Sequence, residues 1–574
     1  MFKKRTFNLI FFTATFFLFF PFLASAVSMG EKINFFVDSS YDLQERQEVT
    51  ASLEKLSNKL YFYIDDNWLS DQNPQARAQI AEILNNLTIE FESRIYPIIT
   101  SNFGTERKPG IDNDERITVL LHQMKEDVGG YFNSADEYPK IQIPRSNERE
   151  MIYLNTTLID NPNAKSALAH EFMHLVTFNQ KEFLHNVTEE TWLNEMYSEF
   201  TSTLLGYDNI YSGSTLQKRV KVFLEKPSDS LTEWLGENYD YGVVNLFMQY
   251  LVDHYGLKIL VDSMHSLKIS IPSIDESLKK NGFSEHFNQI FTNWTIAVLV
   301  NDCSLGQRYC YLNSNLSNLR ITPVLNFLPL SGDSSLSITH RTTNWAGNWQ
   351  KITGGKGSLD FEFDGTDNII FKVPYLLCDY LGKCSVEFFQ LDTDQKGSVN
   401  VEEFSQEYAS LILIPSIQNK IVGFDGVEPF YIFTWRASIQ SQGGENDNEE
   451  ELRIKLLAQI DFLQKQIVQL QTQINAILLG GGQTIACNQI KSELYFGMDN
   501  NQEVRCLQEF LKSQKNGIYP EELVTGNFYS LTQAAVIRFQ EKYTSEILFP
   551  LNLQQGTGYV GQATLVKINQ LLQI

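Results

Sequence analysis

The segment HEFMH places two histidines one helical turn apart, with a glutamate directly after the first. On an α-helix His170 and His174 would project from the same face, because residues four positions apart lie one above the other. Two neutral imidazoles at this spacing bind Zn²⁺, and a carboxylate beside them takes the proton from the attacking water in hydrolysis. The segment therefore predicts a zinc site in which Glu171 is the general base.

A hydrolytic zinc site needs a third protein ligand and one position left open for water. One pattern has a histidine six residues past the second, but Gln180 holds that position and Thr177 stands where a glycine is expected. The other pattern has a glutamate on a following helix, and ETWLNEMYSEF supplies Glu195, with Glu199 one turn later. We therefore expect Glu195 to be the third ligand and Glu199 to orient an imidazole.

The other histidines are expected to be structural or on the surface. One of them, His185, is an alternative ligand because it belongs to the same helical hairpin. The full set is His122, His185, His254, His265, His286 and His340.

These motifs resemble those of gluzincin metallopeptidases. WLNE recurs in gluzincin aminopeptidases, in which its glutamate is the third zinc ligand, and NEMYSE is similar to the NExxSD of thermolysin-like enzymes. The resemblance implies that Glu195 binds zinc and that Glu199 hydrogen-bonds His170. The family usually has aspartate at the latter position, and glutamate is longer by one methylene.

Upstream motifs are most similar to the hyicolysin family within this group, over about residues 33 to 300. They are FGTERKPGIDNDERITVLLHQ, GGYFNSADEY and SNEREMIYLN. The resemblance implies an α+β, zincin-type catalytic domain, in which the strand before the active-site helix binds substrate as an added edge strand. MIYLN, residues 151–155, holds that place in this sequence.

A gluzincin also needs a hydrogen-bond donor for the oxyanion of the tetrahedral intermediate. YDYGVVNLF offers Tyr239 and Tyr241. Tyr239 with Gly242 matches the Y-x-x-G of the aminopeptidase branch, whereas Tyr241 directly precedes the glycine. Both are equally compatible with core aromatics, so the choice between them stays open.

Length and composition indicate a multidomain, exported protein. The chain has 574 residues, 43% of them apolar, which is enough for several cores. Residues 1–26 combine a basic start, a Phe-rich apolar run and small residues, which is typical of a secretory signal peptide; a retained membrane anchor is the alternative. The formal net charge of −23 argues against nucleic-acid partners. We expect a secreted, extracellular or cell-wall-associated protein.

The six cysteines fall into three local pairs, as oxidising compartments allow. None of the pairs has metal-ligand spacing with nearby histidines, so disulfides are the better interpretation, with the connectivity left open. The pairs are Cys303/Cys310, Cys378/Cys384 and Cys487/Cys506.

The character of the sequence changes at several points, which divides the chain into domains. Residues 27–320 alternate β-rich and helical stretches and form the expected metallopeptidase domain. Residues 321–440 consist of short alternating runs broken by Gly, Asn and Asp, the pattern of an all-β sandwich. A polar linker at 441–451 precedes a short coiled coil at 452–479 and a compact C-terminal domain at 484–574.

The predicted coiled coil rests on an apolar seam spaced alternately by four and three residues. With one exception, Ile occupies the a positions and Leu the d positions, which favours a parallel two-stranded coil and hence a homodimer. A single amphipathic helix packed on a neighbouring domain is the alternative. The seam consists of Leu456, Ile460, Leu463, Ile467, Leu470, Ile474 and Ile477.

The C-terminal domain resembles the peptidoglycan-binding module, a small three-helix bundle, over about ninety residues. An insertion, SEILFPLNLQQ, departs from the family pattern before the last helix and puts the identity of the ligand in doubt. The resemblance implies cell-wall peptidoglycan as a partner, although most of the matching residues report the fold. They include Leu507, Gln508, Gly526, Phe528, Thr532, Phe539, Gln540, Gly558 and Thr564.

Two weaker patterns suggest Ca²⁺ as a second candidate cofactor. DTDQKGSVNVEEF places Asp392, Asp394 and Glu403 at EF-hand loop positions, but Lys396 occupies a ligand position, so a hairpin turn is the better interpretation. GIDNDERI carries two aspartates that an Asx turn explains equally well.

These features together predict a secreted, cell-wall-associated zinc metalloendopeptidase that hydrolyses peptide bonds of protein or peptide substrates. Two alternatives remain: a hydrolase of peptidoglycan stem peptides (an autolysin), and a non-catalytic wall-bound adhesin built on a protease fold.

Deleting residues 452–479 tests the coiled coil. We expect the deletion to convert a dimer into a monomer, because the apolar seam is the predicted dimer contact. Light scattering of both proteins measures the change, and a parent chain that is already monomeric would contradict the prediction.

Overall fold

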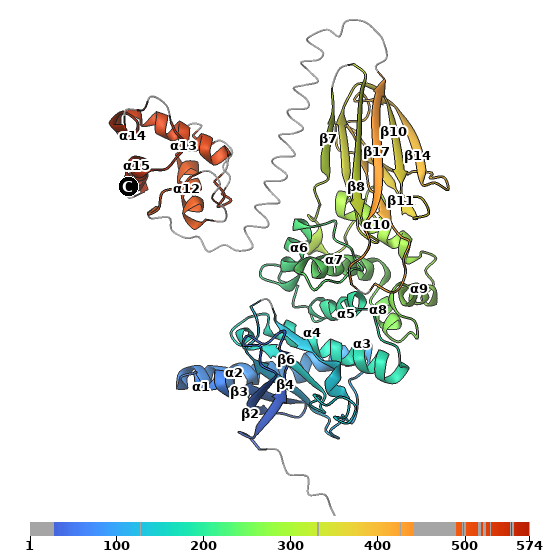
Figure 1. Ribbon diagram of the computed structural model, residues 1–574, viewed down its shortest axis with the longest axis vertical. Helices are drawn as coiled ribbons and strands as arrows, with labels where there is room; N and C mark the ends of the chain where they lie inside the picture. The colour runs from blue at the N-terminus through green and yellow to red at the C-terminus, as the bar shows by residue number, and fades with distance from the viewer. Residues whose placement is uncertain are drawn as a thin grey trace, which may run out of the picture. The chain divides into compact units, whose positions relative to one another are not determined.

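The computed structural model describes residues 28–440 and 489–572, apart from residues 127, 330, 331 and 425 and several short gaps beyond residue 495 (Figure 1). The expected signal peptide (1–26), linker (441–451) and coiled coil (452–479) lie outside the described residues. The chain divides into two compact units, one ending at Asn186 and the other beginning at Val187. No helix of the described part is long and apolar enough to cross a membrane.

The N-terminal unit contains a six-stranded mixed sheet in the order β1-β2-β3-β4-β6-β5. The central strands β3, β4 and β6 are parallel, and every residue in them is buried, as expected for strands covered on both faces. The strands are β1 (Lys32–Phe36), β2 (Glu48–Leu56), β3 (Leu60–Asp65), β4 (Ile117–His122), β5 (Gly130–Phe132) and β6 (Met151–Asn155).

The position of β6 in this sheet corrects one expectation. MIYLN forms β6 as a strand, but β6 lies between β4 and β5, so both of its backbone edges are already paired. Among the described residues the sheet ends instead at β5, which runs antiparallel to β6. With only three residues, β5 is too short to show an alternating pattern, and for this reason the sequence did not reveal it.

Helices pack against this sheet and carry the HEFMH segment. They are α2 (Pro74–Glu90), α3 (Tyr96–Phe103) and α4 (Ala164–Thr177). α2 begins as its sequence predicts, because the Asn73 side chain accepts a hydrogen bond from Ala76 N and Pro74 occupies the first turn. α4 packs against β5 and β6, and Phe172 on this helix contacts the rings of Phe91 and Tyr96.

The second unit begins with helices and continues into two sheets. The helices are α5 (Thr191–Leu204), α6 (Thr215–Glu225), α7 (Asn238–Tyr255), α8 (Lys258–Met264), α9 (Ser270–Lys280) and α10 (Phe287–Val300). α7 and α10 confirm the helical spacing of apolar residues in the sequence. Phe247, Phe287, Phe291 and Trp294 from these two helices form one aromatic cluster.

Residues 324–440 form a four-stranded sheet, β14-β10-β17-β8, and a five-stranded sheet, β13-β12-β15-β9-β7, with a short pair β11-β16. Both sheets contribute to one apolar core, which includes Phe361, Trp435 and Leu411. Two of the three expected disulfides are confirmed, Cys303–Cys310 and Cys378–Cys384, whereas Cys487 lies outside the described residues. The strands are β7 (Val324–Leu328), β8 (Ser334–Thr342), β9 (Gln350–Gly354), β10 (Gly357–Gly365), β11 (Phe371–Lys372), β12 (Pro374–Cys378), β13 (Cys384–Phe388), β14 (Lys396–Phe404), β15 (Ser410–Leu413), β16 (Ser416–Ile417) and β17 (Tyr431–Gln440).

The C-terminal part contains α12 (Gln502–Ser513), α13 (Ser530–Lys542), α14 (Thr544–Ile547) and α15 (Gln562–Leu572). The buried side chain of Gln508 on α12 organises the loop that follows. Its Oε1 accepts hydrogen bonds from Thr525 N and Gly526 N, both at 2.8 Å. Its Nε2 donates to Asn527 O at 3.0 Å and to Thr532 Oγ1 at 2.9 Å.

The same arrangement recurs 32 residues later around Gln540 (540 − 508 = 32). Gln540 Oε1 accepts from Thr557 N at 2.8 Å and Gly558 N at 3.0 Å. Its Nε2 donates to Tyr559 O at 2.7 Å and to Thr564 Oγ1 at 3.0 Å. Both glutamines of the sequence pattern are therefore buried and support the fold.

The Gln508→Ala substitution should destabilise the C-terminal part by about 2–4 kcal/mol, because it leaves two buried backbone N–H groups without their acceptor. Hydrogen exchange of residues 502–542 in the full chain measures the effect as faster exchange. Gln502→Ala, at an exposed position of the same helix, is the matched control and should leave the exchange unchanged. Equal exchange in both variants would contradict the structural role.

Candidate metal centre

The HEFMH segment lies in α4, which confirms the predicted helix. The Nε2 atoms of His170 and His174 are 3.2 Å apart, and their rings meet at 78°. Glu171 is 6% exposed and His174 is 8% exposed, so both side chains lie in a largely buried environment. The apolar neighbours Phe172 and Met173 are completely buried and fix the orientation of the helix.

The donor set fits zinc. Two nitrogen ligands about 2.0–2.1 Å from one tetrahedral ion are separated by about 3.3 Å, close to the distance found between the two imidazoles. His170, His174 and Glu195 each offer one ligand atom, and these atoms lie within 4.8 Å of one another. In the part of the chain that the structure describes, no other set of three or more acidic, histidine or cysteine side chains brings its ligand atoms together in this way.

The two other ligand positions weighed from the sequence have structural contacts. The Nδ1 atom of His185 lies 2.6 Å from Gln180 O, and His185 does not belong to the group that could hold a metal. Gln180 itself donates to Thr105 O at 2.8 Å. Both residues therefore make structural contacts in or next to the helical segment that follows α4.

Gly130 of β5 is a site residue that the sequence analysis did not single out. A Cβ atom at this position would lie 2.9 Å from Glu171 Oε1 and 2.6 Å from Tyr153 O. The backbone of the edge strand therefore packs directly against the carboxylate of Glu171, which only glycine allows. The signal in the sequence was the pair Gly129-Gly130 before an aromatic residue.

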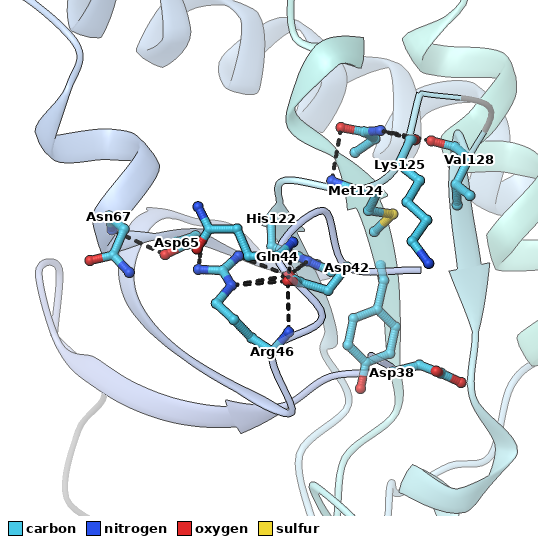
Figure 2. Close-up of polar contacts among 12 residues, drawn as sticks. Asp38, Asp42, Gln44, Arg46, Asp65, Asn67, His122, Met124, Lys125 and Val128 are labelled. Carbon is cyan, nitrogen blue, oxygen red and sulfur yellow. Dashed lines mark hydrogen bonds and ion pairs between the residues drawn. The ribbon is translucent and has the colours of Figure 1, made fainter. Parts of the chain in front are cut away.

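The segment that leads into β5 is held by Asn155, which is fully buried at the end of β6. Its Nδ2 donates to Val128 O at 2.8 Å and to Lys125 O at 3.3 Å, and its Oδ1 accepts from Met124 N at 3.4 Å (Figure 2). Its backbone N–H donates to Gly129 O at 2.9 Å. Asn155 thereby determines the path of the chain into the edge strand.

A buried ionic cluster lies beside this segment (Figure 2). Asp42 accepts hydrogen bonds from Arg46 Nη2 at 2.8 Å and Nε at 3.1 Å, and its Oδ2 lies 3.1 Å from His122 Nδ1. Arg46 also forms an ion pair with Asp65 at 2.7 Å. Burial alone would raise the pKa of Asp42, but the hydrogen bonds from Arg46 lower it below its ordinary value. Burial lowers the pKa of His122, which favours the neutral ring.

This cluster fastens the loop of residues 37–47 to the end of β4. Leu43 N donates to Gln123 O at 3.1 Å, and Lys125 N donates to Tyr41 O at 2.9 Å. Residues 124, 125, 128 and 129 of the same segment are the ones that Asn155 contacts before β5. Buried polar contacts around Asp42 therefore support the segment that leads to Gly130, which contacts Glu171.

Glu199, the expected orienting residue, is buried on α5 within a polar cluster of the second unit. Its carboxylate accepts from Arg219 Nε at 2.8 Å and Nη2 at 2.6 Å, and from Asn245 Nδ2 at 3.0 Å. Burial opposes the charge of Arg219, but Glu199 raises the Arg219 pKa above its ordinary value. Arg219 therefore keeps its positive charge beside the Glu199 carboxylate. Arg219 and Asn245 were not recognised in the sequence, because neither belongs to a motif of fixed spacing.

The two candidate tyrosines on α7 have different neighbours. The Arg219 guanidinium lies 4.5 Å from the ring centroid of Tyr241, which links this tyrosine to Glu199. Tyr239 instead lies 5.2 Å below the ammonium of Lys226. Only Tyr241 therefore contacts the polar cluster around Glu199.

Two sequence patterns considered for calcium form turns. Asp392 Oδ1 accepts from Asp394 N at 3.0 Å and Lys396 N at 2.9 Å, and the strand β14 continues to Phe404, through the end of the loop where an EF-hand would start its second helix. Asp112 Oδ1 accepts from Asp114 N at 2.8 Å, the Asx turn expected from the sequence.

The similarity of this chain to solved structures is too low to identify its fold. One is the periplasmic lysozyme inhibitor PliG of Aeromonas hydrophila, with a TM-score of 0.15 and 11% identity over 21% of this chain and 100% of that chain. Another is a family GH115 4-O-methyl-α-glucuronidase, with a TM-score of 0.11 and 8% identity over 57% of this chain and 51% of that chain.

Comparison of sequences is more informative. No protein-family model matches the chain. Over 190 residues the chain is 28% identical to the neutral metalloprotease ShpI of Staphylococcus hyicus, which covers 29% of this chain and 41% of that protein. The chain thus spans less than half the length of this relative. Part of the chain is therefore related to a metalloprotease.

Proposed function

We propose that the protein is a zinc metalloendopeptidase of the gluzincin type. The observation that supports this most is the set of ligand atoms of His170, His174 and Glu195 within 4.8 Å of one another. The partial relationship to a neutral metalloprotease supports the same reaction class. The substrate is a protein or peptide, and the catalytic part has the α+β zincin-type fold.

Glu171 carries the proton in this reaction. When bound, zinc polarises the scissile carbonyl and makes the attacking water more acidic. The Glu171 carboxylate takes the proton from that water and then returns it to the nitrogen of the leaving amine. Its burial against Gly130 restricts the carboxylate to a narrow range of positions, which favours proton transfer along one path.

The edge strand β5 would hold the substrate. An extended peptide that adds to β5 as a further strand gains backbone hydrogen bonds and lies beside Glu171, because Gly130 contacts that carboxylate. In this role β5 replaces β6, which has no open edge in the described sheet.

Tyr241 is the better candidate for the oxyanion donor. The ring of Tyr241 contacts Arg219, and Arg219 holds Glu199 in place. Glu199 lies on α5, the helix that also carries Glu195. Glu199 would orient His170 through its remaining acceptor capacity, as in the resembled family. The two hydrogen bonds from Arg219 hold the Glu199 carboxylate in place for that hydrogen bond.

Export and wall attachment complete the proposal. The signal peptide at residues 1–26 would direct secretion, and the C-terminal domain would bind peptidoglycan and retain the enzyme at the cell wall. A coiled coil at 452–479 would make the attached enzyme a homodimer.

The decisive experiment compares wild type with Glu171→Gln, both beginning at residue 27. We expect one zinc per chain in both proteins, and casein hydrolysis that falls by about 10²–10⁴-fold in the variant, because the amide cannot take a proton. Metal analysis and the rate of casein cleavage measure the two quantities.

The other outcomes separate the alternatives. Bound zinc with degradation of purified sacculi but not of casein would support the autolysin. Bound zinc with neither activity would support the non-catalytic adhesin. Absence of zinc from both proteins would contradict the metal site itself.

Gly130→Ala tests the contact between β5 and Glu171. The added Cβ must displace the Glu171 carboxylate, so we expect kcat/KM for casein to fall by about tenfold or more while the zinc content stays the same. Gly129→Ala is the matched control, because a Cβ at Gly129 meets no atom within 4 Å. Similar losses in both variants would show that the loop as a whole, and not this contact, matters for activity.

A further inference from the structure

Two buried carboxylates lie together in the N-terminal unit, away from the HEFMH segment in the sequence. Glu137 ends a short helical turn between β5 and β6, and Glu150 directly precedes β6. Each is only 2% exposed. Their carboxyl groups are close enough to interact directly, and burial together with the charge of Glu150 raises the pKa of Glu137 well above its ordinary value.

These carboxylates have few hydrogen-bond donors. Glu150 Oε1 accepts from Ile111 N at 2.7 Å. Its Oε2 and both carboxylate oxygens of Glu137 have no hydrogen-bond partner among the described residues. Gly110 leaves room for this arrangement, because a Cβ at that position would overlap Glu150 Oε2. Three acceptor oxygens are thus buried without a hydrogen-bond donor. This costs free energy of folding unless a cation or a proton binds to them.

The surrounding charges do not compensate the pair. The neighbouring acids are Asp112, which acts on Glu150, and Asp136, which acts on Glu137; the neighbouring bases are Arg107 and Arg149. If all four carboxyl groups are ionised, they face two guanidinium groups and leave two negative charges (−4 + 2 = −2). Asp136 already accepts hydrogen bonds from Tyr153 and Asn147, so the shortage concentrates on Glu137 and Glu150. A divalent cation would balance it.

We propose that Glu137 and Glu150 hold a Ca²⁺ ion. All the donors are oxygens, which suits a hard cation and disfavours zinc. Calcium tolerates irregular coordination by six to eight oxygens, whereas Mg²⁺ demands an octahedron. Within the described residues no third acidic or histidine side chain completes a compact group here, so backbone carbonyls and water supply the remaining ligands.

The ion would tie together three segments around the edge strand. Glu137 follows β5 in the chain, Glu150 begins β6, and the loop at Gly110–Ile111 contacts Glu150. Calcium would therefore stiffen the connection that runs from β5 into β6. The proposal does not rest on the proposed peptidase function, because it follows from the unpaired carboxylates alone.

Calcium binding to the full chain tests the proposal without an activity assay. We expect millimolar Ca²⁺, added to protein in calcium-free buffer containing zinc, to raise the melting temperature by about 5 °C. Equilibrium dialysis should show that Glu137→Gln binds one Ca²⁺ fewer per chain than wild type, with the temperature shift lost. Glu150→Gln should give the same result and serves if the first variant folds poorly.

Asp208→Asn is the matched control. Asp208 is also buried and its pKa is raised by burial, but both carboxylate oxygens accept hydrogen bonds, from Thr203 Oγ1 and Leu216 N. This variant should keep the calcium stoichiometry and the temperature shift of wild type, even if its melting temperature is lower.

A shared proton is the competing account, and pH separates the two. A carboxyl pair with a raised pKa is protonated in the folded state, so without calcium the stability of the folded protein would fall as the pH rises above the ordinary pKa of glutamate. The calcium proposal is overturned if wild type loses stability with rising pH, calcium does not shift its melting temperature, and Glu137→Gln lacks this pH dependence. In that case the pair shares a proton. Equal calcium binding in wild type and Glu137→Gln would overturn it as well.

Discussion

The 3.2 Å separation of the two Nε2 atoms on α4 is the constraint on which the site depends. A helix places residues i and i+4 on one face, but it does not hold their rings at the spacing of two ligands on one ion. Packing does this, because Phe172 contacts Phe91 and Tyr96 and the helix has no freedom to rotate. Apolar packing therefore sets the geometry of the candidate metal site.

The position of Glu171 depends on a second constraint, the absence of a side chain at Gly130. The carboxylate and the strand occupy neighbouring space only because glycine has no Cβ. The strand in turn follows the path that Asn155 sets through backbone carbonyls, beside the loop that Asp42, Arg46 and His122 fasten to β4. Polar groups far from the histidines in sequence thus fix where the Glu171 carboxylate lies.

Buried carboxylates recur throughout this acidic chain, and what differs is how each is compensated. Asp42 and Glu199 each accept hydrogen bonds from an arginine, and for Asp42 these bonds lower the pKa in spite of burial. Glu137 and Glu150 have one backbone donor between them among the described residues. Because an uncompensated buried charge is costly, the same physical rule that explains the arginine beside Glu199 points to a cation at Glu137.

The sequence by itself determined the local elements. Periodicity and motif spacing predicted the helix of HEFMH, the strand MIYLN, the short alternating strands of residues 324–440 and two disulfides, since each depends on residues close together in the chain. The glutamines at 508 and 540 were visible in the sequence as part of the resemblance to the peptidoglycan-binding module, whereas their matching contacts came from the structure.

Only the tertiary structure decided which segments meet. MIYLN is an inner strand because residues 130–132 pair with its second edge. The sequence of MIYLN itself contains no sign of this pairing. Arg219 reaches Glu199 across 20 residues, and Glu137 reaches Glu150 across 13 (150 − 137 = 13), without any spacing rule. A sequence pattern shows which face of an element is buried, but long-range pairing and the compensation of buried charge decide what covers that face.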